Sequence, residues 1–79
     1  MTKAIYRPEY QILQDMLRQR RIAAGMTQAQ CSAALGRPQS FMSDVERGTR
    51  RLDLVQLRDL IEVLGGGWMG FLEEFAAKT

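Results

Sequence analysis

Apolar residues recur at helical spacing near the start of the chain. In the segment YQILQDMLRQRRIAAG they form a stripe at Tyr10, Leu13, Leu17 and Ala24. Pro8 stands near the beginning of this segment and Gly25 follows it, which are positions that these residues favour at helix ends. The pattern predicts a helix over about residues 8–24.

Two further helices are marked by residues that cap helix N-termini. Thr27 precedes the segment QAQCSAAL, which stops at Gly36, and Asp53 precedes LVQLRDLIEVL. Thr and Asp side-chain oxygens accept hydrogen bonds from the free N–H groups of a first helical turn. The second segment carries a wide apolar stripe at Leu54, Leu57, Leu60, Ile61 and Leu64. It is therefore expected to face a core.

The segment RPQSFMSDVERG predicts a short helix over residues 38–47, with Pro38 suited to open it and Gly48 to close it. One stripe is apolar and contains Phe41, Met42 and Val45. Another is polar and contains Ser40, Ser43, Asp44 and Arg47. One face can thus hold the helix to a core while the other points outward.

Only Gly36 and Arg37 separate residue 35 from Pro38, so a tight turn joins the second and third helices. Two short helices joined in this way cross steeply, as in a helix-turn-helix. We expect small Ser32 at their closest approach. The apolar contacts between the two helices are expected from Cys31, Leu35, Met42 and Val45.

The segment WMGFLEEFAAK predicts a fifth helix with Trp68, Phe71, Leu72 and Phe75 on one side. No segment alternates as a strand would, so we expect the all-α class: a compact bundle of five short helices containing a helix-turn-helix, with residues 1–79 in one domain. Four large apolar side chains exceed what one short helix needs for docking. Residues 68–77 are therefore predicted to supply a dimer interface from these four residues, with a core role for Trp68 or Leu72 as the alternative.

Composition places the chain among ordinary soluble domains, at 46% hydrophobic and 25% charged residues. It has no apolar run near the roughly 20 residues that a membrane span needs. The N-terminal stretch MTKAIYRPEY has no apolar signal-peptide core, so a cytoplasmic protein is expected. The single cysteine, Cys31, excludes an internal disulfide and is expected to be a small buried hydrophobe.

Charge is unevenly distributed along the chain. Residues 18–51 hold seven arginines against two acids, a segment charge of +5. From residue 52 onward five acids outnumber two bases, which gives −3. A concentrated basic segment on a nearly neutral chain suggests a surface that faces a polyanion, although a solvated charged face is the simpler alternative.

One pattern of residues at fixed spacing runs through positions 13–65. It consists of Leu17, Arg18, Arg21, Gly25, Thr27, Gln28, Leu35, Gly36, Gln39, Ser40, Ser43, Glu46, Gly48, Arg50, Arg51, Leu52 and Asp53. This pattern strongly resembles the Xre/Cro-type helix-turn-helix DNA-binding family, whose fold is the lambda-repressor-like bundle. The resemblance implies a double-stranded DNA-binding protein, usually a homodimer on a palindromic operator, with residues 38–47 as the recognition helix in the major groove.

The resemblance also implies roles for individual residues. Gln28 would bond a phosphate, Gln39, Ser40 and Asp44 would face base edges, Ser43 would lie at the groove wall, and Arg50 and Arg51 would reach the backbone. With Arg47 on the same face, the predicted DNA-binding residues are Gln28, Gln39, Ser40, Ser43, Asp44, Arg47, Arg50 and Arg51. Gln28 can instead extend the capping of its helix, and Ser43 can simply cover the helix surface. Arg21 and Glu46 would form a partly buried ion pair that ties the recognition helix to the scaffold.

Four residues depart from the family pattern. Cys31 and Ser32 stand where a larger aliphatic residue and an alanine are typical, which predicts slightly looser packing. Arg37 occupies a turn position that is usually apolar. Asp44 replaces a lysine, arginine or glutamine, and an acid near phosphate lowers affinity unless it accepts a hydrogen bond from a cytosine amino group.

Enzymatic chemistry finds little support in the sequence. Without histidine, neither Cys31 nor a serine has an imidazole base, and no Cys/His cluster can hold zinc, so we expect no enzyme, no metal and no cofactor. The segment GGGWMG matches the spacing G-x-G-x-x-G but follows a predicted helix rather than a strand. Its glycines are better interpreted as a helix stop and a link.

Two functions remain. The first is a sequence-specific transcriptional regulator, most simply a repressor that occupies a promoter operator. The second is an antitoxin-like or accessory protein-interaction module, which would hold a toxin, polymerase or other protein through the aromatic C-terminal segment. The sequence names neither the operator nor the regulated gene.

Overall fold

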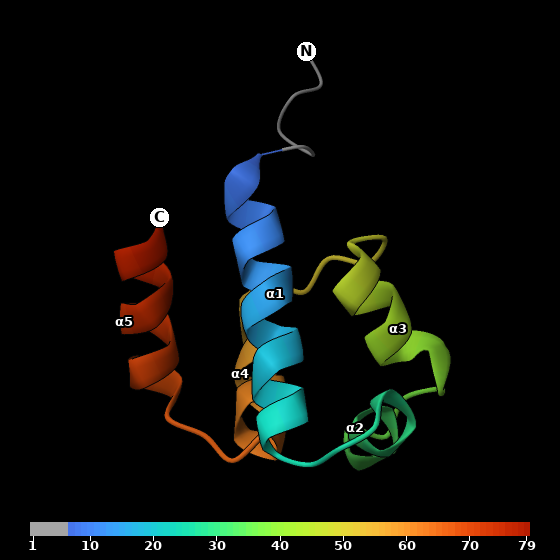
Figure 1. Cartoon of the computed structure of the whole chain (residues 1–79). Coiled ribbons are helices and arrows are strands. Elements are labelled where there is room, and N and C mark those ends of the chain that lie inside the picture. The colour runs from blue at the N-terminus through green and yellow to red at the C-terminus, as the bar shows by residue number, and fades with distance from the viewer. Residues whose placement is uncertain (1–6) are drawn as a thin grey trace.

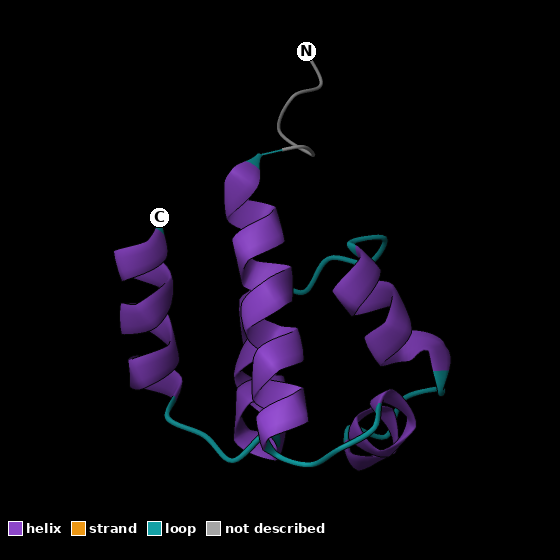
Figure 2. Cartoon of the chain, in the orientation of Figure 1, coloured by secondary structure: helices purple, strands orange, loops and turns teal. Residues whose placement is uncertain are grey.

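Residues 7–79 are described by a computed structural model, and within this range loops and turns join helices and no strand is present (Figure 1, Figure 2). Its helices are α1 (Pro8–Ala23), α2 (Gln28–Ala34), α3 (Ser40–Arg47), α4 (Leu54–Val63) and α5 (Trp68–Lys78). The expected all-α class is confirmed. Residues 1–6 lie outside the described part of the chain. They include most of the N-terminal stretch MTKAIYRPEY, in which the sequence shows no apolar signal-peptide core.

The predicted helix starts are correct except for α3. Pro38 was expected to open it, but the α-helix begins at Ser40. Residues 38 and 39 form a preceding turn, in which the backbone N–H of Phe41 donates to the carbonyl of Pro38 at 2.9 Å. The difference is small because Gln39 already has helical dihedral angles, with φ −55° and ψ −34°.

Two of the helices begin with reciprocal side-chain caps. The Thr27 hydroxyl accepts from the N–H of Gln30 at 3.0 Å, and the Gln30 amide accepts from the N–H of Thr27 at 2.9 Å. Asp53 and Gln56 repeat this arrangement at the start of α4. Each box satisfies two backbone donors that the helix itself leaves free.

Helix α1 is the central element of the bundle, and it packs against both α3 and α5. Figure 1 shows α5 on one side of α1 and the α2–α3 pair on the other. Helix α4 also packs against α5.

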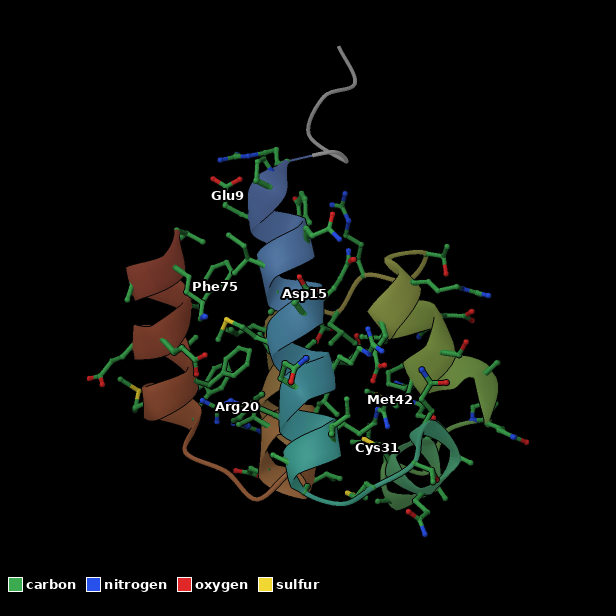
Figure 3. All side chains as sticks on the ribbon, viewed as in Figure 1. Glu9, Asp15, Arg20, Cys31, Met42 and Phe75 are labelled. Atoms are coloured by element: carbon green, nitrogen blue, oxygen red, sulfur yellow. The ribbon has the colours of Figure 1, made fainter. Side chains whose placement is uncertain are left out.

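The core is formed by apolar residues from all five helices. Its buried members are Met16, Leu17, Cys31, Phe41, Met42, Val45, Leu60, Ile61, Leu64 and Phe71. Figure 3 shows Cys31 and Met42 near each other on the α2–α3 side, with Phe75 on the α5 side. Because Cys31 is fully buried, it is the small core residue that the sequence predicted.

One predicted interface residue belongs to this core instead. Phe71 is 0% exposed, so it has no surface to offer a second subunit. Trp68, Leu72 and Phe75 are partly buried against the same core. Phe71 is therefore a core residue and not the interface residue that the sequence predicts, because this side of α5 turns toward α1 and α4 and buries the ring.

Candidate nucleic-acid interface

The turn between α2 and α3 is held by a buried serine. The Ser32 hydroxyl accepts a hydrogen bond of 3.0 Å from the backbone N–H of Met42 and donates one of 3.3 Å to the carbonyl of Gln39. No side chain of α3 itself caps its N-terminus. Ser32 therefore satisfies, from α2, a donor in the first turn of α3, and so helps to set the orientation of that helix.

A second polar network fixes the other end of α3. The guanidinium of Arg21 donates to both carboxylate oxygens of Glu46, at 2.6 and 3.1 Å, and also to the carbonyl of Met26 at 2.8 Å. The side chains of Arg21 and Glu46 are only 12% and 5% exposed. Hydrogen bonding to Glu46 raises the pKa of Arg21, against the opposing effect of burial. The geometry is that of a partly buried, bidentate ion pair between α1 and α3.

Gln28 belongs to the same network. Its side-chain amide donates to Glu46 at 3.0 Å, so the first residue of α2 is connected to α3 and, through Glu46, to α1. The alternative capping role does not apply, because Thr27 and Gln30 form the cap of α2. An amide carries two N–H donors, and only one of them is used in this contact.

The outer face of α3 forms a polar hollow with the start of α2. It is lined by Gln28, Ala29, Gln39, Ser40 and Ser43. Four predicted DNA-binding residues are thus brought together by the fold. Gln39 and Ser40 are exposed, whereas Ser43 and Gln28 are half-buried.

Asp44 and Arg47 lie further along the same helix and pair with each other. The Arg47 guanidinium and an oxygen of Asp44 form an ion pair one helical turn apart. Arg47 is 64% exposed and Asp44 35%. The acid that departs from the family pattern therefore has a cationic partner on its own helix, a contact that the i,i+3 spacing of the two residues favours.

The predicted backbone-contacting arginines each lie over an aromatic ring. The Arg50 guanidinium is 5.0 Å from the centre of the Phe41 ring. Arg51 is 4.0 Å from the Tyr10 ring centre and donates to the Tyr10 hydroxyl at 3.1 Å. Cation–π contacts of this kind restrict where a long side chain can place its charge. The role of Tyr10 could not be found from sequence, because forty-one positions separate it from Arg51.

On the other side of α1, a cation and a ring connect α1 to α5. Arg20 lies 5.0 Å from the Phe71 ring centre and donates to Glu74 at 2.9 Å. Figure 3 shows Arg20 directed from α1 toward α5. Met69 is the large apolar residue of α5 that remains most open, at 65% exposure.

Other kinds of site are not found in the part of the chain that the structure describes. No three Asp, Glu, Cys or His side chains within residues 7–79 come together as a metal site would require. None of the described helices has the length and apolar character needed to cross a membrane.

A polar helix held by an abutting helix, with arginines beyond its end, is the geometry of a helix-turn-helix DNA-binding domain. A family model described as a helix-turn-helix domain matches residues 13–67. Among solved structures, the chain is similar to an XRE-family like protein from Pseudomonas syringae pv. tomato str. DC3000, with 42% sequence identity and a TM-score of 0.88. That alignment covers 99% of this chain and 95% of the other. No curated protein sequence matches the chain at a significant level.

The chain therefore belongs to the Xre family of helix-turn-helix proteins, which are DNA-binding regulators.

Proposed function

We propose that this protein is a transcriptional repressor that reads an operator with the outer face of α3. The observation that carries the proposal is the division of α3 into two faces. Phe41, Met42 and Val45 are buried, while Gln39 and Ser40 are exposed beside Gln28. A helix anchored along one side and polar along the other fits a major groove about 12 Å wide.

Within this helix, Gln39 is the proposed base reader. Its amide can donate and accept at once, which allows a bidentate contact with adenine worth about 1–3 kcal/mol of discrimination. Ser40 is shorter and pairs with more than one base. Gln28 has one amide N–H free of Glu46, and we assign that donor to a phosphate, which would set the register of α3.

Selection of binding sites from a random duplex library tests this assignment. The wild-type protein is expected to enrich one motif, and Gln39→Ala to lose base preference at a single position of it. Gln19→Ala, on the α1–α5 side of the domain, is the control and should leave the motif unchanged. An unchanged motif for Gln39→Ala would remove α3 as the reader. Enrichment of no motif at all would favour the protein-interaction alternative.

Arg51 is proposed to contact the DNA backbone. Tyr10 holds the Arg51 guanidinium by stacking and by a hydrogen bond. The side chain therefore loses little conformational entropy when DNA binds. Arg51→Ala should flatten the dependence of log Kd on log salt by about 1 on every duplex tested. Retention of the wild-type slope on operator and unrelated DNA would contradict a phosphate contact.

We further propose that two copies bind a palindromic operator in the cytoplasm and exclude polymerase from the promoter. Met69 at 65% exposure and the uncovered parts of Trp68, Leu72 and Phe75 offer apolar surface on α5. A two-fold pair would place two recognition helices about one DNA turn apart.

Sedimentation velocity at micromolar concentration tests the dimer. The wild-type protein, free or on a selected operator, is expected to sediment as a pair of subunits, and Met69→Lys to dissociate it. Val55→Lys is a control with a comparably exposed apolar residue on α4, at 59% exposure. The dimer proposal would be contradicted if the free protein sedimented as a monomer and only one copy bound each operator. The proposal of a palindromic operator would then fall as well.

A further inference from the structure

Two arginine side chains, not one, lie over the ring of Phe41. The guanidinium carbon of Arg37 is 5.2 Å from the ring centre and that of Arg50 is 5.0 Å from it. Arg37 precedes α3 and Arg50 follows it, so residues from both ends of α3 meet at one ring. Phe41 is buried, with only 6% of its surface exposed, whereas both arginines are exposed.

Neither arginine has an acidic partner in the described part of the chain. The two acids within residues 18–51 already form ion pairs, since Asp44 pairs with Arg47 and Glu46 pairs with Arg21. Two like charges gathered at one ring repel each other, and the ring's electrons offset only part of that cost. An arrangement of this kind is stabilised when an anion binds between the guanidinium groups.

The position of the pair relative to α3 indicates which anion. Phe41 and Glu46 are five residues apart, which turns them about 140° from each other around the helix axis. Glu46 contacts Gln28. The Arg37–Arg50 pair therefore lies along the flank of α3 away from Gln28, and the polar outer face lies between these two flanks.

A major groove has the same layout, with phosphates of one strand along each wall. We infer that Arg37, Phe41 and Arg50 form a phosphate-binding clamp for the DNA strand on the opposite wall of the groove from the one that Gln28 would contact. This rests on the proposed docking of α3 and adds Arg37 to its contacts. Phe41 acts as the platform: its ring holds both charges in place before DNA arrives, which reduces the ordering cost of binding.

The site also accounts for Arg37. The Arg37 side chain reaches the ring at the start of α3, which is the ring that Arg50 also reaches. The departure from the pattern and the second arginine are thus parts of one arrangement.

The test uses the full chain, the motif selected by the wild-type protein, and an unrelated duplex. Because the two arginines share one phosphate, replacing both with glutamine should flatten the log–log salt slope by about 1 on both duplexes, and Arg37→Gln or Arg50→Gln alone should flatten it by less. The double variant should lose less affinity than the product of the single losses, because both arginines hold one phosphate. Arg58→Gln, on α4, removes an exposed arginine of the acidic segment and should leave the slope unchanged.

Neutral methylphosphonate groups placed one at a time along the operator identify that phosphate. One substitution should weaken the wild-type protein severalfold and leave the double variant unaffected. Phe41→Leu keeps an apolar side chain at the site but removes the ring, and should weaken binding through the same phosphate; its helical content and melting temperature confirm that it folds.

The outcomes separate this inference from the function on which it rests. A wild-type protein that selects a motif, with wild-type salt slopes for Arg37→Gln and the double variant, overturns the clamp and leaves the reading role of α3 intact. Additive losses that map to two different phosphates also overturn it, because the arginines would then act separately. A wild-type protein that selects no motif overturns both.

Discussion

The hydroxyl of Ser32 in α2 accepts a hydrogen bond from the backbone N–H of Met42 in α3, ten residues further along the chain. Ser32 and Met42 are both 0% exposed, so this donor has no access to water. Through this contact, a side chain of α2 satisfies a free backbone donor in the first turn of α3. It therefore connects the stability of the domain to the orientation of α3.

Ser32→Ala is expected to destabilise the protein by about 1–3 kcal/mol, because it leaves the Met42 N–H buried without a partner. Urea unfolding followed by circular dichroism measures the change. The exposed Ser40 supplies a matched control, and Ser40→Ala should leave the midpoint nearly unchanged. Equal midpoints for Ser32→Ala and the wild type would show that this hydrogen bond adds nothing to stability.

Glu46→Gln is expected to cost about 3–5 kcal/mol, since it strands the Arg21 charge in a partly buried position. For a domain of this size, that loss lowers the melting temperature by more than about 10 °C. Glu9→Gln removes one partner of an exposed Arg7–Glu9 pair and should not change the melting temperature measurably. Similar small shifts for both variants would mean that the Arg21–Glu46 pair behaves as a surface ion pair.

Cys31 is expected to be unreactive in the folded protein and to make stability fall at alkaline pH. Burial raises the pKa of its thiol above the ordinary value. The thiol therefore stays protonated when folded at a pH where the unfolded chain has begun to lose the proton. This contribution to stability is complete below about pH 8.5 and declines as the pH rises from there toward the raised pKa.

Unfolding midpoints between pH 7 and pH 10 measure this effect for the wild type and for Cys31→Ala. The alanine variant is expected to be less stable at pH 7 but to lose stability less steeply with pH. Parallel curves would rule out a contribution from the thiol. A native thiol that reacts with a disulfide reagent as fast as the urea-unfolded chain would contradict its burial.

Asp44→Ala is expected to tighten binding to all duplexes. Arg47 would lose its partner on α3 and become an additional cation facing the DNA, so the log–log salt slope should steepen by about 1. Asp59→Ala breaks an Arg58–Asp59 contact of 3.7 Å on α4 and is the control, with no expected change in slope. Loss of a cytosine preference at one operator position, with an unchanged slope, would instead make Asp44 a base reader.

Features that depend on neighbouring residues were predictable from the sequence. The five helices follow from apolar spacing, and Thr27 and Asp53 mark two starts because capping involves residues only three positions away. The two faces of α3 follow from its helical period in the same way. The Arg21–Glu46 pair was predicted through family spacing, and the structure contains it.

Contacts that depend on how the helices cross were decided by the tertiary structure. Periodicity assigned Phe71 to an apolar face of α5, but only the packing of α5 on α1 and α4 determined that this ring is fully buried. Likewise, Arg37 and Arg50 are thirteen positions apart, and they meet at Phe41 because the turn before α3 and the loop after it fold back onto the same side of the helix. Local patterns determine which side of a helix is apolar or charged, whereas the partner of each side chain depends on the crossing of helices that are distant in sequence.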